Sequence, residues 1–470
     1  MLCRYAIPPD VMGEDARTKL VNTVNRAIGH VISRAPTLQV GISGEDSNKP
    51  FWIKLETVDL NEHIKWTTLD DATDSDQSVQ AAVAAQLDTR FFELGVRPGW
   101  RVLVMNHTAS DILDILFVWN HPHGDGISGK IFHQLLLEAL NVMERGPEGN
   151  LSDLILKVGD SSKEFPPATE SLVALPVTPL FVLKEAWNDY KPPSLFPGKI
   201  EASWAPIRTL PYKTRFQSFL IPEGILSKVV TICHDHKTTL TALLNSLVLI
   251  SLASHLGQEN APAFASSTAI DQRRFLPPHP LAYRWFEPKK TIANYVSIMT
   301  HEYDSDLVGQ IRSKLSTDVT HGILPEATLS LLWSIAARVR SEIAKRLESG
   351  LQNDVVGLMR FVPNWRKQFL RDVKKVRKLS WFLTNLGVFE EDPATNSTQP
   401  SRPETGWSIS RAQFTISTET PMAALLLGVA SVKNQSLVVT CTWQDTVVEA
   451  YLVESLMADM DRWLTQIGSQ

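Results

Sequence analysis

The sequence predicts an α/β fold made of two halves, each a mixed sheet flanked by helices. Runs with helical periodicity alternate with short apolar strands in both halves, and a proline-rich stretch over 166–211 separates them. The 470 residues, 43% hydrophobic and 21% charged, can supply a core for two domains. We expect a first half over 1–195, a crossover linker over 196–212 and a second half over 213–470.

Helices are predicted in the first half where apolar residues recur every three or four positions, and strands where short apolar runs end at polar turns. The predicted helices span 16–33, 78–94 and 128–142, and the predicted strands span 38–40, 51–60, 100–106 and 112–120. The polar turn 107–110 between the last two strands indicates a hairpin or a neighbouring pair.

The second half shows the same alternation of helices and strands. The predicted strands span 215–221, 264–270, 295–303, 381–384, 407–418, 423–432 and 436–443. The predicted helices span 225–236, 239–256, 307–320, 326–347 and 447–466. The polar, acidic stretch 390–405 is expected to be a loop.

Composition excludes several classes of protein. A formal net charge of -5 disfavours a general nucleic-acid or anionic-membrane surface. Cys3, Cys233 and Cys441 lie far apart without a CxxC pair, which indicates reduced thiols in a cytoplasmic protein. The N-terminus lacks the apolar core of a signal peptide. The most apolar window, 240–256, contains polar residues and is read as a buried helix, so no membrane span is expected.

The stretch Asn120-His-Pro-His-Gly-Asp-Gly126 follows an apolar strand and precedes a helix. An imidazole at a strand end beside glycines could be partly desolvated, neutral near pH 7 and able to accept a proton. Asp125 suits a brace that accepts backbone N–H bonds or pairs with an arginine.

Other readings of this stretch stay open from the residues alone. It could be a surface turn, or His121 and His123 could begin a metal site with Asp125 as third ligand. No companion His/Cys/Glu cluster supports a metal site. The sequence also lacks a GxSxG elbow, a Walker loop and a GxGxxG fingerprint.

His121 to Gly126 resembles the HxxxDG motif of the coenzyme-A-dependent acyltransferase superfamily, which has the chloramphenicol-acetyltransferase-like fold. The fungal alcohol and trichothecene O-acetyltransferase branch is the most similar, and the resemblance spans roughly 15–470. Further segments in family order carry it: the helix over 239–256, Ala269-Ile-Asp-Gln-Arg-Arg-Phe-Leu-Pro277, Ala293-Asn-Tyr-Val296, Thr384-Asn-Leu-Gly-Val-Phe389, Trp407-Ser-Ile-Ser410 and Phe414-Thr415.

This resemblance implies a tunnel between the halves with His121 near its middle. His121 would deprotonate an alcohol or amine that attacks an acyl thioester. Asp125 and Gly126 would be structural, with Asp125 paired to Arg273 or Arg274; alternatively, these arginines are a solvated pair.

Two asparagines receive roles by the same resemblance. Asn385 would donate a hydrogen bond to the developing oxyanion, and Asn294 would line the channel. The alternative for Asn385 is a turn residue that caps Gly387, and the alternative for Asn294 is a structural role.

The implied activity is O-acylation of a small natural-product alcohol from a coenzyme A thioester, most simply acetyl-CoA, by a monomeric fungal enzyme without a permanently bound cofactor. A carrier-protein-dependent transacylase or condensation-type off-loading enzyme is the alternative within the fold. A pericyclase or ligand-binding descendant is the alternative outside acyl transfer.

Two departures from the family pattern put the acyl donor in doubt. The first family strand is not visible before residue 15, and the plant-type DFGWG motif is absent. A basic stretch also remains to be explained: Arg366, Lys367, Arg371, Lys374, Lys375, Arg377 and Lys378. It predicts a solvated helix face, or an electropositive mouth for coenzyme A phosphates or an acidic carrier protein.

Overall fold

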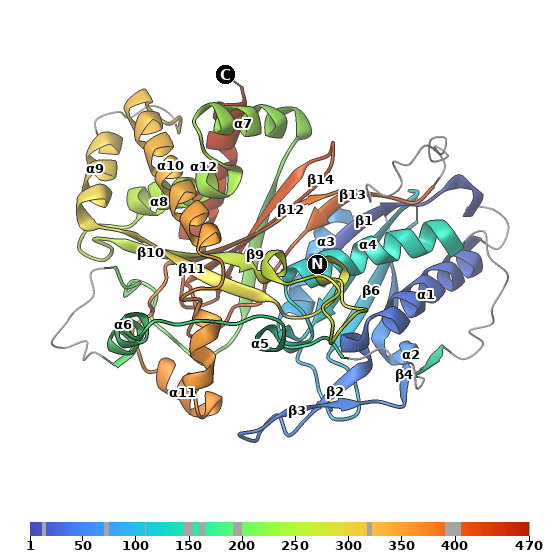
Figure 1. Ribbon diagram of the computed structural model, residues 1–470. Coiled ribbons are helices and arrows are strands. Elements are labelled where there is room, and N and C mark those ends of the chain that lie inside the picture. The colour runs from blue at the N-terminus through green and yellow to red at the C-terminus, as the bar shows by residue number, and fades with distance from the viewer. Residues whose placement is uncertain are drawn as a thin grey trace.

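Two mixed sheets, lying side by side in two lobes, organise the chain (Figure 1). The computed structural model describes residues 1–11, 16–69, 75–108, 110–143, 154–158, 165–190, 200–316, 322–390 and 406–469. The first sheet has the strand order β13-β1-β7-β6-β5. Its strands are β1 (Leu2–Ala6), β5 (Ile64–Leu69), β6 (Trp100–His107), β7 (Ile112–Trp119) and β13 (Ser408–Gln413). The antiparallel pair β6–β7 is the hairpin that the sequence predicted.

The second sheet has the order β11-β10-β12-β14-β15-β9. Its strands are β9 (Thr214–Ile221), β10 (Phe264–Asp271), β11 (Val296–Tyr303), β12 (Trp381–Phe389), β14 (Leu425–Val432) and β15 (Leu437–Gln444). β12 runs parallel to β10 and β14, and the other pairs are antiparallel. Two small ladders pair β2 (Val40–Ser43) with β3 (Phe51–Lys54) and β4 (Thr57–Asp59) with β8 (Ile155–Lys157).

Helices flank both sheets, and most of the long ones bury an apolar face against them. The helices are α1 (Ala16–Arg34), α2 (Leu60–His63), α3 (Ser75–Leu87), α4 (Gly126–Met143), α5 (Thr169–Leu172), α6 (Pro179–Tyr190), α7 (Glu223–Asp235), α8 (Leu240–His255), α9 (Ser305–Ser316), α10 (Glu326–Glu348), α11 (Trp365–Asp372) and α12 (Ala450–Gly468). α1 and α4 share one core with the first sheet, and α7, α8, α10 and α12 share another with the second. The mixed α/β architecture predicted from the sequence is therefore correct.

Short 3-10 turns join several of these elements. They are η1 (Pro9–Val11), η2 (Pro36–Gln39), η3 (His121–His123), η4 (Gln272–Phe275), η5 (Pro288–Lys290) and η6 (Val355–Phe361). The predicted loop over 390–405 lies, except for Glu390, outside the described residues.

The lobes exchange a strand, since β13 comes from the second half of the sequence and pairs with β1 in the first sheet. The chain after β13 then passes tightly over β14. A Cβ atom at Gly428 of β14 would lie 2.2 Å from the carbonyl oxygen of Phe414, so only glycine permits this crossing. The division of the chain at 196–212 stays a prediction.

The expectation of no strand before residue 15 is wrong. β1 occupies residues 2–6 and hydrogen-bonds on both sides, to β7 and β13. It was not predicted because it is only five residues long and is soon followed by Pro8-Pro9.

The proline-rich stretch contains a helix, α6, that the sequence reading missed. Its prolines flank the helix instead of interrupting it, because Pro179 stands at the first helical position, where its missing N–H costs nothing. β12 is also longer than predicted and continues through Asn385 to Phe389, with an irregular register at Gly387, whose φ is +69°.

Among the described residues, no single helix combines the length and apolar character needed to cross a bilayer; only α7 and α8 together, bent by 94°, do so. Of these, α8 is the core helix that the sequence predicted, with twelve buried residues. The three cysteines are free and buried.

Candidate active site

Residues 120–125 join β7 to α4 and carry the motif; we call them the motif loop. Hydrogen bonds that cap α4 hold the C-terminal end of this loop. Asp125 precedes the first residue of α4, and its Oδ1 accepts from the backbone N–H of Ser128 at 2.8 Å. In return, the Asp125 N–H donates to Ser128 Oγ at 3.2 Å. This reciprocal pair satisfies donors that a helix N-terminus otherwise leaves free.

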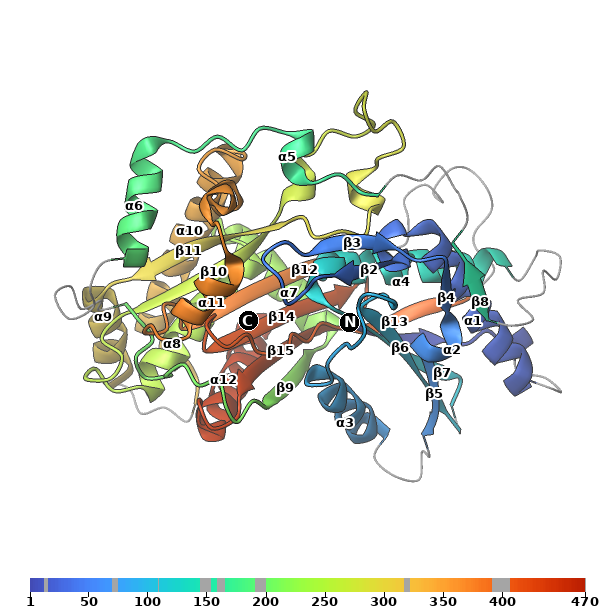
Figure 2. The same cartoon turned by 90° about the horizontal axis from the view of Figure 1, so that it is seen from below.

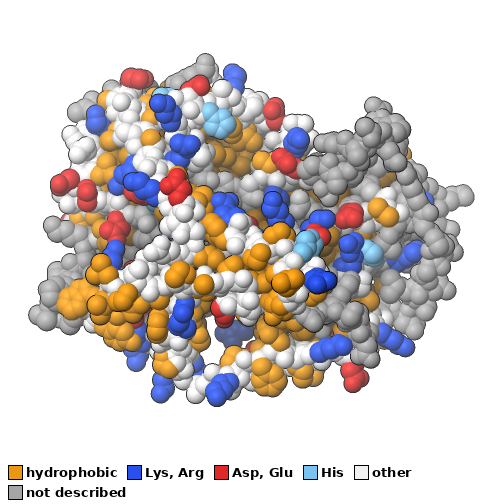
Figure 3. Space-filling view, in the orientation of Figure 1, with side chains coloured by type: hydrophobic (Ala, Val, Ile, Leu, Met, Phe, Trp, Pro, Cys, Tyr) orange, Lys and Arg blue, Asp and Glu red, His pale blue; other side chains and the backbone are white. Residues whose placement is uncertain are grey.

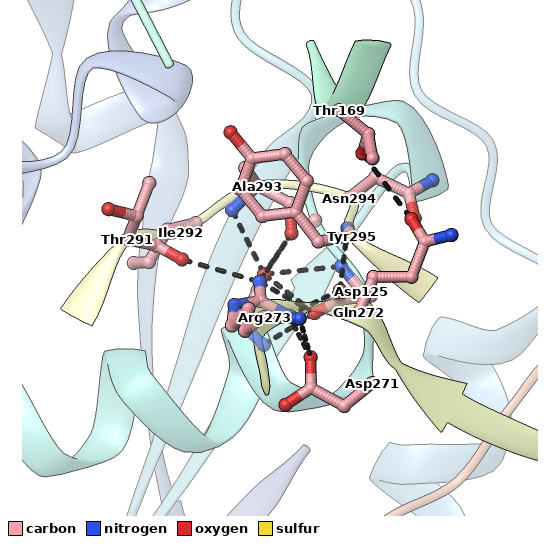
Figure 4. Close-up of polar contacts among 12 residues, drawn as sticks. Asp125, Thr169, Asp271, Gln272, Arg273, Thr291, Ile292, Ala293, Asn294 and Tyr295 are labelled. Atoms are coloured by element: carbon pink, nitrogen blue, oxygen red, sulfur yellow. Dashed lines mark hydrogen bonds and ion pairs between the residues drawn. The ribbon is translucent and has the colours of Figure 1, made fainter. Parts of the chain in front are cut away.

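Asp125 also binds the second lobe through a bidentate ion pair with Arg273 (Figure 4). Arg273 Nη1 lies 2.7 Å from Asp125 Oδ2, and Nη2 lies 3.1 Å from Oδ1. Both side chains are almost fully buried. Burial alone would lower the pKa of Arg273, but the charges and hydrogen bonds of Asp125 and, secondarily, Asp271 outweigh burial and raise that pKa.

The same groups hold the backbone of residues 293–295. Asp125 Oδ2 accepts from the N–H of Tyr295 at 2.8 Å. The Ala293 carbonyl accepts from Arg273 Nη2 at 2.6 Å and from Ser128 Oγ at 2.8 Å. We call Asp125, Ser128, Arg273 and this backbone segment the latch. Because its members come from both lobes, the latch fixes the motif loop at the junction between them.

The latch presents Asn294 to His121. Asn294 Nδ2 lies 3.0 Å from His121 Nδ1 and 3.3 Å from the His121 carbonyl oxygen. Both side chains are exposed. An amide nitrogen can only donate, so this orientation assigns the proton of the neutral ring to Nε2. A half-turn of the amide would let Oδ1 accept from Nδ1–H and would leave Nε2 free to accept a proton.

His123 has the opposite environment. It is buried, its Nε2 accepts from the N–H of Gly99 at 3.1 Å, and its ring meets the edge of Trp52 at 5.0 Å between centroids. Burial lowers the pKa of His123 to about 4. The described residues contain no group of three or more His, Cys, Asp or Glu placed to bind a metal. His123 is therefore a structural histidine, and the metal reading has no geometric support in the described part of the chain.

The arginine pair divides into a buried and an exposed member. Arg273 enters the latch, whereas Arg274, the next residue of η4, is exposed and makes no contact with Asp125 among the described residues. The sequence did not distinguish the two arginines. They are adjacent, and only the geometry of the turn η4 determines which side chain points into the protein.

Asn385 is engaged in its own turn. Its Oδ1 accepts from the N–H of Gly387 at 2.9 Å, and its Nδ2 donates to Thr241 Oγ1 at 3.0 Å. These bonds match the turn alternative for Asn385. In the part of the chain that the structure describes, no hydrogen bond joins Asn385 to His121 or Asn294.

Gly126 permits close contact with the second lobe. A Cβ atom at this position would lie 2.7 Å from Leu386 Cδ2 and 3.1 Å from Phe414 Cζ. Lys130, one turn further along α4, donates to the carbonyl oxygens of Leu386 and Val388 at 3.3 and 2.6 Å. The sequence reading missed Lys130 and Ser128. The Asp-x-x-Ser spacing signals a helix cap for Ser128, whereas nothing local signals the contacts of Lys130.

Comparison with known proteins decides the family. A family model described as alcohol acetyltransferase matches residues 49–286, just over half of the chain. The chain belongs to the alcohol acetyltransferase family. It is therefore an acyltransferase enzyme, and the predicted superfamily and branch are confirmed.

Two curated relatives of this alcohol acetyltransferase cover most of its length. The probable alcohol acetyltransferase FCK4 of Fusarium pseudograminearum is 27% identical over 466 residues, which cover 95% of this chain and 86% of the relative. The probable alcohol acetyltransferase crmB of Aspergillus fumigatus is 23% identical over 384 residues, covering 80% and 75%.

Solved structures show the fold of this alcohol acetyltransferase. The TRI3 trichothecene 15-O-acetyltransferase of Fusarium sporotrichioides matches with a TM-score of 0.66 and 13% identity, over 99% of this chain and 90% of that chain. The condensation domain of the Monacolin K polyketide synthase MokA matches with a TM-score of 0.56 and 9% identity, over 100% and 92%. At these identities the likeness concerns fold alone.

Proposed function

We propose that this alcohol acetyltransferase moves an acetyl group from acetyl-CoA to a hydroxyl of a small natural-product acceptor, with His121 as the general base. The observation that carries the proposal is the contrast along the motif loop. Asp125 is buried in a two-lobed ion pair, while His121, four residues earlier, exposes its imidazole at the same junction.

The proposed reaction needs one proton carrier. Nε2 of His121 takes the proton of the acceptor hydroxyl while the oxygen attacks the thioester carbonyl. The tetrahedral intermediate then collapses, the C–S bond breaks, and the leaving thiolate receives the proton from the imidazolium. The products are an acetate ester and free coenzyme A, so atoms and charge balance without a metal.

Asn294 acts in this proposal as the positioning residue for His121. With its amide oxygen turned to Nδ1–H, it selects the tautomer whose Nε2 is free, and it would stabilise the imidazolium that forms. The backbone of Asn294 is held between Ala293 and Tyr295 of the latch, so the amide is delivered at a fixed place by contacts between the lobes.

A carrier-protein donor is the second candidate, because condensation domains share the fold. A cytoplasmic location belongs to the proposal and rests on the three free, buried cysteines.

The donor assay measures free-thiol release and ester formation for acetyl-CoA and for an acetylated acyl carrier protein with a panel of alcohols. Ester formation with acetyl-CoA as the better donor supports the proposal. A faster reaction with the carrier protein would select the second candidate. Absence of thiol release with both donors, alongside cyclisation of a neutral polyene, would select a non-acylating descendant.

A further inference from the structure

One helix of the second lobe has no apolar face against the core. α6 contains no buried residue, and Leu180, Leu183, Trp187 and Tyr190 are 78%, 68%, 55% and 70% exposed. Their spacing of three or four positions places them along one stripe of the helix. Isolated exposed apolar residues are ordinary, but a whole helical stripe facing water marks an interaction surface.

Two neighbouring elements extend this stripe. α11 exposes Trp365, Phe369 and Leu370, and β3 exposes all four of its residues, among them Phe51 and Trp52. Figure 3 shows hydrophobic side chains gathered along the lower edge of the molecule, where Figure 1 places α6, α11 and β3. Figure 2, which views that edge from below, places α11 between the other two.

Polar contacts hold the three elements together. The guanidinium of Arg371 on α11 lies 4.3 Å from the ring centroid of Tyr190 and forms an ion pair with Asp189, both on α6. On its other side, Asn364 at the start of α11 donates to Asn48 of the β2–β3 hairpin at 2.7 Å. We call the exposed apolar side chains of α6, α11 and β3 the apolar face.

The charge beside the apolar face is strongly positive. Residues 359–378 contain eight Lys or Arg and one acidic residue, although the whole chain has a net charge of -5. Positive charge is therefore concentrated in this segment, although the net charge of the whole chain is negative. Lys367 and Lys374 are exposed, and no acidic partner for either is found among the described residues.

Two features limit how this basic segment can be interpreted. Arg377 is buried and donates to the carbonyl oxygens of Ala205 and Ala423, and burial lowers its pKa to about 10. Arg377 thus belongs to the core and not to a solvated face. Asp189 receives Arg371, Lys375 and Lys378, so these cations are partly neutralised. Of the remaining cations, Arg366 and Lys367 lie on α11 next to exposed Trp365 and Phe369, and Arg366 also pairs with Asp46. Lys374 follows the end of α11, and Arg360 lies in η6.

The geometry points to an anionic phospholipid surface as the occupant of the apolar face. Coenzyme A phosphates would need the cations but not a stripe of Leu, Trp and Tyr. A neutral bilayer would need the apolar groups but not the segregated charge. Trp187 and Tyr190 of α6 lie beside the Lys and Arg residues of α11 and of the segment after it. Together they combine what the headgroup region of an anionic membrane binds.

Docking there would bring the motif loop close to the membrane. Trp52 of the apolar face contacts the ring of His123, two residues after His121. An apolar acceptor dissolved in the bilayer would then have a short path to the site. Membrane binding itself does not depend on acyl transfer and can be tested without it.

The test is flotation of the full-length protein with vesicles of phosphatidylcholine alone or with added phosphatidylserine. We expect the protein to float with the anionic vesicles only and to be released by salt. Lys367→Gln/Lys374→Gln should weaken partitioning roughly 30-fold, since each basic residue near an anionic surface contributes a factor of about 5. Leu183→Ser/Trp187→Ser should abolish flotation.

Matched control variants distinguish binding through the apolar face from nonspecific adsorption to vesicles. Lys228→Gln/Lys433→Gln removes two exposed lysines, and Tyr451→Ser one exposed aromatic, elsewhere on the surface. Both should float like the wild type. Equal loss in the face variants and the controls, or no flotation with any vesicle, would overturn the inference. Concentration-dependent self-association lost in Leu183→Ser/Trp187→Ser, without vesicle binding, would assign the face to a second copy instead.

Discussion

His121 and His123 lie two residues apart and have opposite environments. His121 is exposed beside Asn294 at the junction of the lobes, whereas His123 is buried between Gly99 and Trp52. Spacing alone could not assign these roles, because both side chains belong to a single 3-10 turn. The difference in burial arises from residues distant in the sequence: Asn294 beside His121, and Gly99 and Trp52 around His123.

Replacing Asn294 tests its role as a positioning residue. Asn294→Ala should lower kcat about tenfold, the value of one hydrogen bond in the transition state. Asn294→Asp should restore much of the rate and move the acid limb of the pH–rate profile to higher pH, because a carboxylate favours the protonated ring. The measurement is kcat/KM against pH for the three proteins. A rate loss in both variants with an unmoved profile would show that Asn294 only supports the backbone.

The elements around the site are joined by buried, charged contacts in addition to apolar packing, because the core of the first lobe extends to Leu386 and Val432 of the second. Asp125 at the start of α4 and Arg273 in η4 connect lobes 148 residues apart in sequence. The resemblance named both residues, but their bidentate geometry and the Ser128 and Ala293 contacts required the fold. Such contacts depend on packing between residues that are distant in the sequence, and hydrophobic periodicity does not predict them.

Breaking the latch should destabilise the protein strongly. Asp125→Asn removes the buried charge partner of the Arg273 guanidinium and leaves only Asp271, at 3.1 Å and part-exposed, which should cost about 3 kcal/mol. Arg273→Lys cannot reproduce the bidentate fork and should also be costly. Denaturant unfolding measures both. Arg274→Lys on the exposed neighbour is the control and should change the free energy of unfolding by less than about 0.5 kcal/mol. Equal effects at 273 and 274 would be incompatible with the latch.

The elements of the two lobes differ in whether the sequence predicts them. Long periodic elements such as α1, α8 and α12 follow from their apolar spacing, and the β6–β7 hairpin follows from its polar turn. β1 and the exchange of β13 could not be predicted, because each rests on pairing across more than 100 residues. α6 was obscured by the prolines at its ends.

Stability of the whole molecule should depend on pH through its buried histidines. Burial lowers the pKa of His123 to about 4 and that of His133 to about 3, below the ordinary value of 6.5. As pH falls below 6.5, the unfolded chain takes up protons that these buried rings do not bind in the folded protein. The free energy of unfolding therefore falls, down to about pH 4 for His123 and about pH 3 for His133. By pH 4 each histidine has contributed about 3 kcal/mol to this loss.

Denaturant unfolding between pH 4 and 6.5 checks this dependence. His133→Gln should flatten the slope of unfolding free energy against pH, even if the variant is less stable at neutral pH. His234→Gln, at an exposed site on α7, should leave the slope unchanged. An unchanged slope in His133→Gln would mean that other groups cause the loss.

The most direct measurement for the proposed activity is the rate of acetyl transfer by His121→Ala. If His121 is the general base, kcat should fall about 10²–10⁴-fold, with wild-type unfolding behaviour because the side chain is exposed. His30→Ala should retain the full rate. Transfer by His121→Ala at an undiminished rate would contradict the assignment of His121 as the base.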